Sequence, residues 1–252
     1  MTITKAQEIA DLAASGAVFY VSHSGGKDSQ AMYAVISRVV PTGQIVVVHA
    51  DLGDVEWPGV QDHIRANITH QLNVVRAGKT FFDMVERRAK TRPDVPAFPS
   101  SATRQCTSDL KRGPIHKFIR NDMKARGKTL ALNCMGLRAA ESPGRAKRHP
   151  LVCNQLLTVA GRIVYEYLPI HDFSDADVFT AIRDAGQEPF WAYTAGNKRL
   201  SCVFCIMGCD SDLRNGAKHR QDLYQRYLDL ETRTGWTMFN GKSLKQRVEG
   251  TS

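Results

Sequence analysis

Ser24-Gly25-Gly26-Lys27-Asp28-Ser29 is the stretch that decides the fold of this chain. It follows an apolar run over residues 17–21 and precedes a helical pattern over residues 31–36. The order strand, glycine turn, helix brings backbone N–H groups and a helix N-terminus to one point, which favours the binding of an anion. The two glycines let the backbone approach a phosphate closely, the lysine adds a positive charge, and the serines offer hydroxyl donors. We therefore predict a phosphate-binding loop, against the alternative of an ordinary glycine turn between a strand and a helix.

The spacing within the loop is not that of the nucleotide-triphosphatase pattern G-x-x-x-x-G-K-[ST], because Asp28 follows Gly-Gly-Lys. It resembles the SGGKDS loop of the PP-loop pyrophosphatases. Members of that group bind ATP and release its β,γ-pyrophosphate, or bind a related adenylyl nucleotide. The resemblance implies that an adenine nucleotide and Mg²⁺ are bound by Ser24, Gly25, Gly26, Lys27, Asp28 and Ser29, and that Lys27 acts in catalysis.

Alternating strand and helix patterns continue along most of the chain. Residues 45–50 form a continuous run rich in β-branched side chains, which is typical of a strand buried on both faces of a parallel sheet. Other strands are expected over residues 17–21, 72–75, 129–135 and 163–168. Helices are expected over residues 3–14, from the loop to about residue 40, and over residues 60–71, 81–89, 110–123, 174–185 and 220–231. This alternation predicts an α/β fold with a doubly wound, mostly parallel sheet.

Asp51 stands at the carboxyl end of the second predicted strand. Because a carboxylate at that position commonly faces the ligand crevice of a parallel sheet, we predict that Asp51 binds the ribose hydroxyls or the metal ion. Beyond about residue 189 the alternation breaks, and a cysteine cluster and a charged helix follow. We therefore predict a nucleotide-binding domain over residues 1–188 and a cysteine-bearing, helical subregion over residues 189–252, packed on the same domain.

Composition and charge limit the class of protein. A chain of 252 residues with 42% hydrophobic and 23% charged residues is ordinary for a globular protein. No apolar run approaches the roughly 18 residues that span a bilayer, and the first residues contain no apolar secretory segment. We expect a cytoplasmic protein without a membrane partner, in which the six cysteines are reduced, metal-bound or catalytic. The net charge of +9 suits a nucleic acid or a nucleotide as partner, the alternative being a merely soluble basic surface.

Two further segments resemble the phosphoadenosine-phosphosulfate (PAPS) reductase family. Residues 136–145, Gly-Leu-Arg-Ala-Ala-Glu-Ser-Pro-Gly-Arg, are similar to that family's G-x-R-x-x-[DE]-S-x-x-R segment. Residues 169–179, Pro-Ile-His-Asp-Phe-Ser-Asp-Ala-Asp-Val-Phe, are similar to its P-[LI]-x-[DE]-[WF]-[TS]-x-x-D-V-[WF] segment. With the loop and a cysteine segment, four motifs stand in the family's order and cover most of the chain. The resemblance implies an adenine-nucleotide α-hydrolase-like fold that takes ATP or a PAPS-like nucleotide.

The first of these segments contributes three candidate site residues. The resemblance implies that Gly136 lies at the nucleotide and that Arg138 and Arg145 are catalytic. A planar guanidinium forks onto phosphate or sulfate oxygens better than lysine does, so both arginines suit that role. The alternative is a pair of surface arginines. Asp172 and Asp177 are expected to orient a turn and cap a helix rather than join the site.

The cysteines distinguish branches of the family. Residues 202–209 have the pattern C-x-x-C-x-x-x-C, and residues 104–111 have the sequence Arg-Gln-Cys-Thr-Ser-Asp-Leu-Lys. In the iron–sulfur adenylylsulfate reductases, a mid-chain cysteine pair and a later C-x-x-C hold a [4Fe-4S] cluster. Here Cys106 matches one member of the pair, Gln105 stands in place of the other, and Cys202 and Cys205 match the C-x-x-C. We predict that these three and Cys209 ligate a [4Fe-4S] cluster, with zinc as the alternative.

The remaining two cysteines and the end of the chain complete the comparison. Cys134 and Cys153 are expected to be small core residues. The assimilatory reductases place their attacking cysteine in a late E-C-G-[LI]-H-like segment, whereas no cysteine follows Cys209 here. Residues 104–111 instead resemble the [RC]-x-C-T-x-x-L-K pattern of the ATP-using, iron–sulfur proteins associated with DNA phosphorothioation, and phage PAPS reductase-like proteins are of similar size.

These observations lead to one main hypothesis and several rivals. The chain is expected to be an ATP pyrophosphatase-type enzyme that adenylylates an acceptor, DNA or tRNA, for sulfur transfer from a donor such as a cysteine desulfurase. The first rival is a PAPS or adenylylsulfate reductase that uses an internal or an external thiol. A non-catalytic nucleotide-binding protein is the second, and adenylyl transfer without sulfur, as in the related FAD synthetases, is the third. The sequence leaves the acceptor, the sulfur donor and the oligomeric state open.

Overall fold

A computed structural model describes residues 3–250. The chain divides into two compact units, of which the first comprises residues up to 49, 61–75 and 115–189. The second comprises residues 50–60, 76–114 and those from 190 onward. The cysteine-bearing C-terminal region is thus grouped with two earlier segments of the chain.

The first unit is built on a six-stranded sheet in the order β3-β2-β1-β4-β6-β5. The strands are β1 (Val18–Ser22), β2 (Ile45–Asp51), β3 (Leu72–Arg76), β4 (Leu130–Cys134), β5 (Leu151–Cys153) and β6 (Ile163–Tyr167). β1 pairs in parallel with β2 and β4, β4 pairs in parallel with β6, and the edge strand β5 is antiparallel to β6. The predicted α/β fold with a doubly wound, mostly parallel sheet is confirmed.

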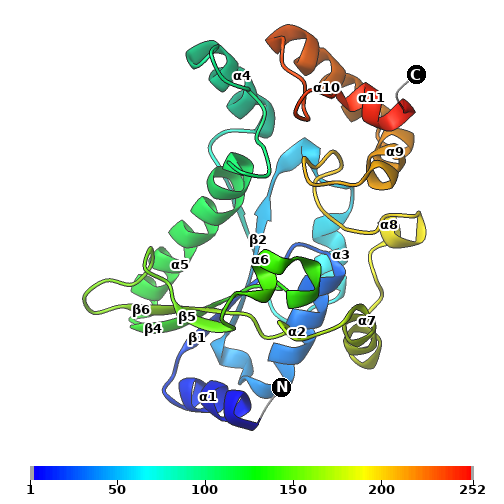
Figure 1. Ribbon diagram of the computed structural model, residues 1–252. Helices are drawn as coiled ribbons and strands as arrows, with labels where there is room; N and C mark the ends of the chain where they lie inside the picture. The colour runs from blue at the N-terminus through cyan, green and yellow to red at the C-terminus, as the bar shows by residue number, and fades with distance from the viewer. Residues whose placement is uncertain (1–2, 251–252) are drawn as a thin grey trace. The chain divides into compact units, whose positions relative to one another are not determined.

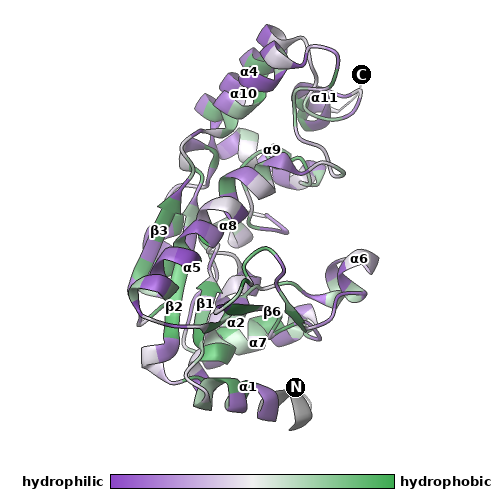
Figure 2. Cartoon of the chain, turned by 90° about the vertical axis from the view of Figure 1, so that its left-hand side faces the viewer, coloured by the Kyte–Doolittle hydropathy of each residue, from purple (hydrophilic) through white to green (hydrophobic). Residues whose placement is uncertain are grey.

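Helices cover both faces of this sheet (Figure 1). On one face α1 (Ile3–Ala14), α2 (Lys27–Val39) and α7 (Asp175–Asp184) share a hydrophobic core with Phe19 and Val21 of β1. On the other face α5 (Gly113–Ala125) packs against Tyr20, whose hydroxyl donates to Asp122 at 2.8 Å. Alternate residues of β1 therefore serve two cores, and in Figure 2 its ribbon is accordingly coloured as hydrophobic.

The other helical segments are α3 (Val60–Ala66), α4 (Phe81–Thr91), a π-helical segment (Thr107–Arg112), α6 (Pro143–Ala146), α8 (Trp191–Thr194), α9 (Asp210–His219), α10 (Gln221–Thr234) and α11 (Leu244–Glu249). Short 3₁₀ turns cover Thr42–Gln44, Gly53–Val55 and Ala139–Glu141. No helix within residues 3–250 is long and apolar enough to cross a membrane.

Two predicted helices differ from those observed. The helix expected over residues 60–71 ends at Ala66, because the next residue, Asn67, turns its side-chain amide onto the carbonyl of His63 at 2.8 Å. The helix expected over residues 110–123 becomes a π-helical segment followed by α5. β5 and the helices α6, α8, α9 and α11 were not predicted, since they are short or polar and carry little periodic signal.

The strand order changes direction at one point of the sheet. β1 lies between β2 and β4, so the chain leaves β1 and β4 in opposite directions. At such a topological switch point the loops that follow the two strands diverge and leave room for a ligand. The loop after β1 contains the glycine motif, and the loop after β4 contains Gly136 and Arg138.

Candidate functional site

The glycine motif forms a braced turn between β1 and α2. Gly25 has a φ of +77°, a left-handed conformation that glycine adopts without strain, and Gly26 is the N-cap of α2. The Ser29 hydroxyl donates to the carbonyl of Gly26 at 2.8 Å and accepts from the backbone N–H of Ser24 at 3.2 Å. The hydrogen bonds of Ser29 thus stabilise the turn, which leads directly into the first N–H groups of α2.

A buried histidine, His23, also stabilises the turn by a hydrogen bond. Its Nδ1 accepts from the backbone N–H of Gly25 at 3.1 Å, so the ring proton of the neutral form lies on Nε2. Burial, with a smaller effect from the neighbouring His49 and His63, lowers the pKa of His23 to about 3. The imidazole therefore stays neutral and acts as a fixed hydrogen-bond acceptor beneath the loop.

Two cations and two carboxylates form a network at the start of α2. Arg138 donates from Nε to Asp28 at 2.7 Å and from Nη2 to Asp175 at 2.7 Å. Lys27 binds the same two carboxylates, at 3.1 Å and 2.8 Å. Only 4% of the Arg138 side chain and 9% of the Lys27 side chain are exposed, whereas 72% of Asp175 is. Lys27 and Arg138 hold the pKa of Asp175 below its usual value.

Sequence reasoning missed Asp175. It is the first residue of α7, and its neighbours Ser174 and Asp177 form the capping box that starts this helix. Asp177 therefore has the capping role that the sequence predicts. Nothing in the local pattern distinguishes Asp175 from an ordinary acidic residue in a first helical turn.

The loop after β4 reaches the glycine motif at Gly136. A Cβ atom on Gly136 would lie 2.8 Å from the carbonyl oxygen of Asp28 and 3.2 Å from the nitrogen of Ser29. Backbone therefore lies against backbone, and only glycine fits. Two of the three residues predicted from this segment, Gly136 and Arg138, are thus brought to the loop.

Arg145 joins the network only indirectly. It lies in α6 and forms an ion pair with Glu141, which also accepts from the backbone N–H of Arg138 at 2.9 Å. The Arg145 carbonyl is 3.0 Å from Nε2 of His171. Glu141 therefore links the two predicted arginines, and the catalytic role of Arg145 stays a prediction.

Asp51 ends β2 and belongs to the second unit. Its carboxylate accepts from both Nε and Nη2 of Arg76, at 3.1 Å and 2.5 Å, and from the backbone N–H of Gly53 at 2.7 Å. These bonds fix the carboxylate at the end of the strand. Binding of ribose or metal by Asp51 stays a prediction.

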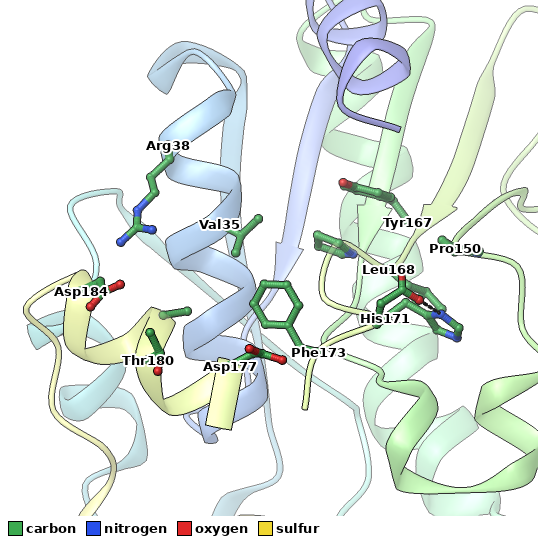
Figure 3. A pocket seen from close by; sticks show the side chains of 13 residues that line it. Val35, Arg38, Pro150, Tyr167, Leu168, His171, Phe173, Asp177, Thr180 and Asp184 are labelled. Atoms are coloured by element: carbon green, nitrogen blue, oxygen red, sulfur yellow. Dashed lines mark hydrogen bonds and ion pairs between the residues drawn. The ribbon is translucent and has the colours of Figure 1, made fainter. Parts of the chain in front are cut away.

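A separate cavity of about 420 Å³ lies in the first unit, between α2, α7 and the segment that follows β6 (Figure 3). Arg38 and Asp184 line it from the two helices, and His171, bonded to Asp172 at 3.2 Å, lines it from the loop. Its lining contains no residue of the glycine motif, and neither Gly136 nor Arg138. This cavity is thus not the predicted phosphate site.

All four predicted metal ligands belong to the second unit, and three of them act on one another electrostatically. Cys106 precedes the π-helical segment, and Cys202 and Cys205 lie between α8 and α9. Burial raises the pKa of Cys106 and of Cys202, and each thiol acts electrostatically on the others. Lys111 opposes these shifts, and the cysteines in turn raise the pKa of Lys111. The Lys111 ammonium group thus favours the thiolate forms of Cys106 and Cys202.

The chemistry of the four cysteines suits a metal bound by thiolates, but their arrangement in the structure does not enclose one. Sulfur donors suit zinc and iron–sulfur clusters, and the backbone N–H of Met207 donates to Sγ of Cys205 at 3.4 Å. Cys209 is exposed, and its thiol lies 3.1 Å from the hydroxyl of Ser211. Within residues 3–250, no three His, Cys, Asp or Glu side chains are arranged closely enough to enclose a metal ion. Metal binding by the four cysteines stays a prediction.

The two cysteines predicted to be core residues differ from each other. Cys134 is completely buried, and burial strongly raises its pKa. Cys153 is exposed on the edge strand β5, so its prediction as a core residue was wrong. A strand of three residues at the sheet edge does not bury alternate side chains as an inner strand does.

A protein-family model for the phosphoadenosine phosphosulfate reductase domain matches residues 18–207. This chain belongs to that family. The match covers most of the chain, including the glycine motif, the Gly136 segment and Cys106, Cys202 and Cys205. It confirms the family resemblance of the motifs, without distinguishing the phosphorothioation branch. No curated protein matches this sequence.

Solved structures with a similar chain path include a PAPS reductase from Candida auris in complex with phosphate. It is 13% identical with a TM-score of 0.47, and the match covers 73% of this chain and 80% of that one. The FMN adenylyltransferase of Candida glabrata with FMN and an ATP analogue is 13% identical with a TM-score of 0.45, and here the match covers 80% of this chain and 63% of that one. Both scores lie below 0.5, so neither similarity bears on the function of this chain.

Proposed function

We propose that this protein is an ATP pyrophosphatase-type enzyme that adenylylates an acceptor, whose oxygen is then replaced by sulfur. The observation that carries the proposal is the convergence of Lys27 and Arg138 on the N-terminus of α2. Two nearly buried cations beside a row of helical N–H groups suit a chain of phosphates better than a single carboxylate. The close fit of Gly136 keeps both loops in contact at this point.

The proposed reaction has two steps. In the first, an oxygen of the acceptor attacks the α-phosphorus of ATP, the bond to the β-phosphate oxygen breaks, and pyrophosphate leaves. In the second, hydrosulfide displaces AMP from the adenylylated acceptor, so that a bond to sulfur replaces the bond to oxygen. Adenylylation thus converts a poorly leaving oxygen into a good leaving group.

The chain's own residues stabilise the charge of the first step. Lys27 and Arg138 would bind the β- and γ-phosphates and neutralise the charge that develops on departing pyrophosphate. The exposed partner of both cations, Asp175, is the one that a phosphate oxygen can replace. Mg²⁺ supplies further neutralisation when it is bound to the phosphates, and Asp51 is the proposed carboxylate for this ion or for the ribose.

The second unit would supply the sulfur side of the reaction. Cys106, Cys202 and Cys205, with Cys209 as the fourth predicted ligand, would hold a [4Fe-4S] cluster or a zinc ion, and such a centre can bind sulfur. This unit contains 19 of the 34 Lys and Arg but 13 of the 25 Asp and Glu, a net charge of +6 against +3 for the first unit. A nucleic acid, DNA or tRNA, is therefore the proposed acceptor.

Sulfonucleotide reduction is the second candidate function. A reductase needs a reactive thiolate that can attack a sulfonucleotide. In the nucleotide-binding unit Cys134 is sealed in the core, and Cys153 lies on the edge strand with its thiol 3.4 Å from the hydroxyl of Thr158. The observation that favours a reductase is Cys209, which is exposed and could be such a nucleophile.

One experiment separates the two candidates. Anaerobically purified protein is given ATP with single-stranded DNA or tRNA, or PAPS with thioredoxin, and pyrophosphate and sulfite are measured side by side. We expect pyrophosphate from ATP and little sulfite from PAPS. Lys27→Ala should abolish pyrophosphate release, and calorimetry should show severely weakened ATP binding. Robust sulfite formation that Cys209→Ser removes would establish the reductase instead.

A further inference from the structure

The carboxylate of Asp175 contacts two buried cations through a single oxygen. Its Oδ1 atom lies 2.8 Å from Nζ of Lys27 and 2.7 Å from Nη2 of Arg138. These distances are those of charge-assisted hydrogen bonds, which lysine and arginine also form with the oxygens of a phosphate. The Asp175 oxygen thus lies where the proposed function requires an oxygen of a phosphate.

The two cations do not depend on Asp175 for their position. Arg138 also donates from Nε to Asp28 at 2.7 Å and from Nη1 to the carbonyl of Phe173 at 3.1 Å. Lys27 also donates to Asp28, at 3.1 Å. Only 25% of the Asp28 side chain is exposed, against 72% of Asp175. If the Asp175 carboxylate left, Asp28 and the Phe173 carbonyl would still hold both cations.

Helix α7 does not depend on these bonds either. The capping box of Ser174 and Asp177 starts the helix, and Val178 and Ile182 lie in the hydrophobic core that α7 shares with α2. Release of Asp175 from the cations therefore requires rotation of its own side chain, without movement of the helix. A free carboxylate in the first turn is still favoured by the helix dipole. Asp175 is thus the partner of the two cations that can leave at the smallest cost.

We propose that Asp175 is an internal competitor for the phosphate position at Lys27 and Arg138. A phosphate that binds there displaces the carboxylate, and the carboxylate returns to the cations as pyrophosphate leaves. This inference deepens the proposed function and rests on its phosphate site. By mass action, such competition weakens the binding of every ligand that places a phosphate at the two cations by the same factor. It does not affect a ligand without phosphate, and it limits inhibition by the product pyrophosphate.

The test compares full-length wild type and Asp175→Asn, which keeps the size of the side chain and removes its charge. Isothermal titration calorimetry gives the Kd for inorganic pyrophosphate, ATP and adenosine in one buffer. For Asp175→Asn we expect pyrophosphate and ATP to bind about three- to thirtyfold more tightly, because two charge-assisted bonds no longer oppose them. The factor should be the same for both ligands, and the Kd for adenosine should not change. A merely loosened site would instead bind all three ligands more weakly.

Asp184→Asn is the matched control. Asp184 is the last residue of the same helix, half-exposed, with Nε of Arg183 3.8 Å away. Its backbone lies about 14 Å along the helix axis from that of Asp175. The variant makes the same change in net charge without touching Lys27 or Arg138, so it should bind all three ligands as wild type does. Equal tightening in Asp184→Asn would show an effect of net charge alone and would overturn the inference.

The outcomes separate this inference from the proposed function. If Asp175→Asn binds pyrophosphate no more tightly than wild type, Asp175 is not a competitor and only the inference is overturned. If neither protein binds pyrophosphate or ATP, the phosphate site is wrong and both proposals fail. If pyrophosphate binding tightens as expected but no acceptor elicits pyrophosphate release from ATP, the inference stands and the proposed function fails. If Asp175→Asn does not fold, Asp175→Ser removes the same charge and must show the same tightening.

Discussion

The contact between Gly136 and the start of α2 allows a prediction with a calculable displacement. In Gly136→Ala the added Cβ would stand 2.8 Å from the carbonyl oxygen of Asp28, whereas ordinary contacts begin at 3.4 Å. The two backbone segments must therefore separate by about 0.6 Å, because the atoms that the Cβ would meet belong to the backbone and cannot rotate away as a side chain could. Arg138, two residues further on, binds Asp28 at 2.7 Å and moves with the segment.

This displacement should affect nucleotide binding more than stability. Overpacking of this kind costs about 1–3 kcal/mol of unfolding free energy. A shift approaching 1 Å in the groups that position a substrate can cost about 100-fold in function. We expect the Kd for ATP to rise about 10- to 100-fold, measured by isothermal titration calorimetry, while the protein remains folded by circular dichroism.

Gly144→Ala provides the control for this experiment. Gly144 lies in α6 of the same sequence segment, and a Cβ atom there would meet nothing within 4 Å. That variant should bind ATP as wild type does. Wild-type affinity in folded Gly136→Ala would refute the argument that these two loops must touch for nucleotide binding.

Two further predictions concern metal content and pH. Cys106→Ser should lower the iron or zinc content of purified protein, measured by elemental analysis, whereas Cys153→Ser should not; equal metal content in both variants would contradict the shared centre. His23 binds a proton below about pH 6.5 in the unfolded chain but only near pH 3 in the folded one, because burial lowers its pKa. The unfolded state therefore takes up the proton first as the pH falls, and stability is lost between these values by about 1.4 kcal/mol per pH unit. Urea unfolding between pH 6.5 and 5 should show a smaller slope for His23→Asn than for wild type, and equal slopes would show that His23 does not titrate as argued.

The sequence by itself determined the features that depend on local chemistry. The β-branched run over residues 45–50 must be buried on both faces, and β2 is buried along its whole length. The glycine motif needs a turn that only glycine adopts easily, and Gly25 has that conformation. Periodicity and turn chemistry act over a few residues, so they predict the α/β fold and the position of the loop without knowledge of distant contacts.

Only the tertiary structure decided which distant side chains meet. Asp175 lies 148 residues from Lys27, and its partnership with Lys27 and Arg138 depends on how α7 packs beside α2. Likewise, Cys209 follows Cys205 in a spacing that suits a ligand, yet Cys106, Cys202 and Cys205 act on one another electrostatically, whereas Cys209 is exposed. Such contacts depend on the path by which the chain returns to itself, and this path is set by the burial of whole helices and strands rather than by any short motif.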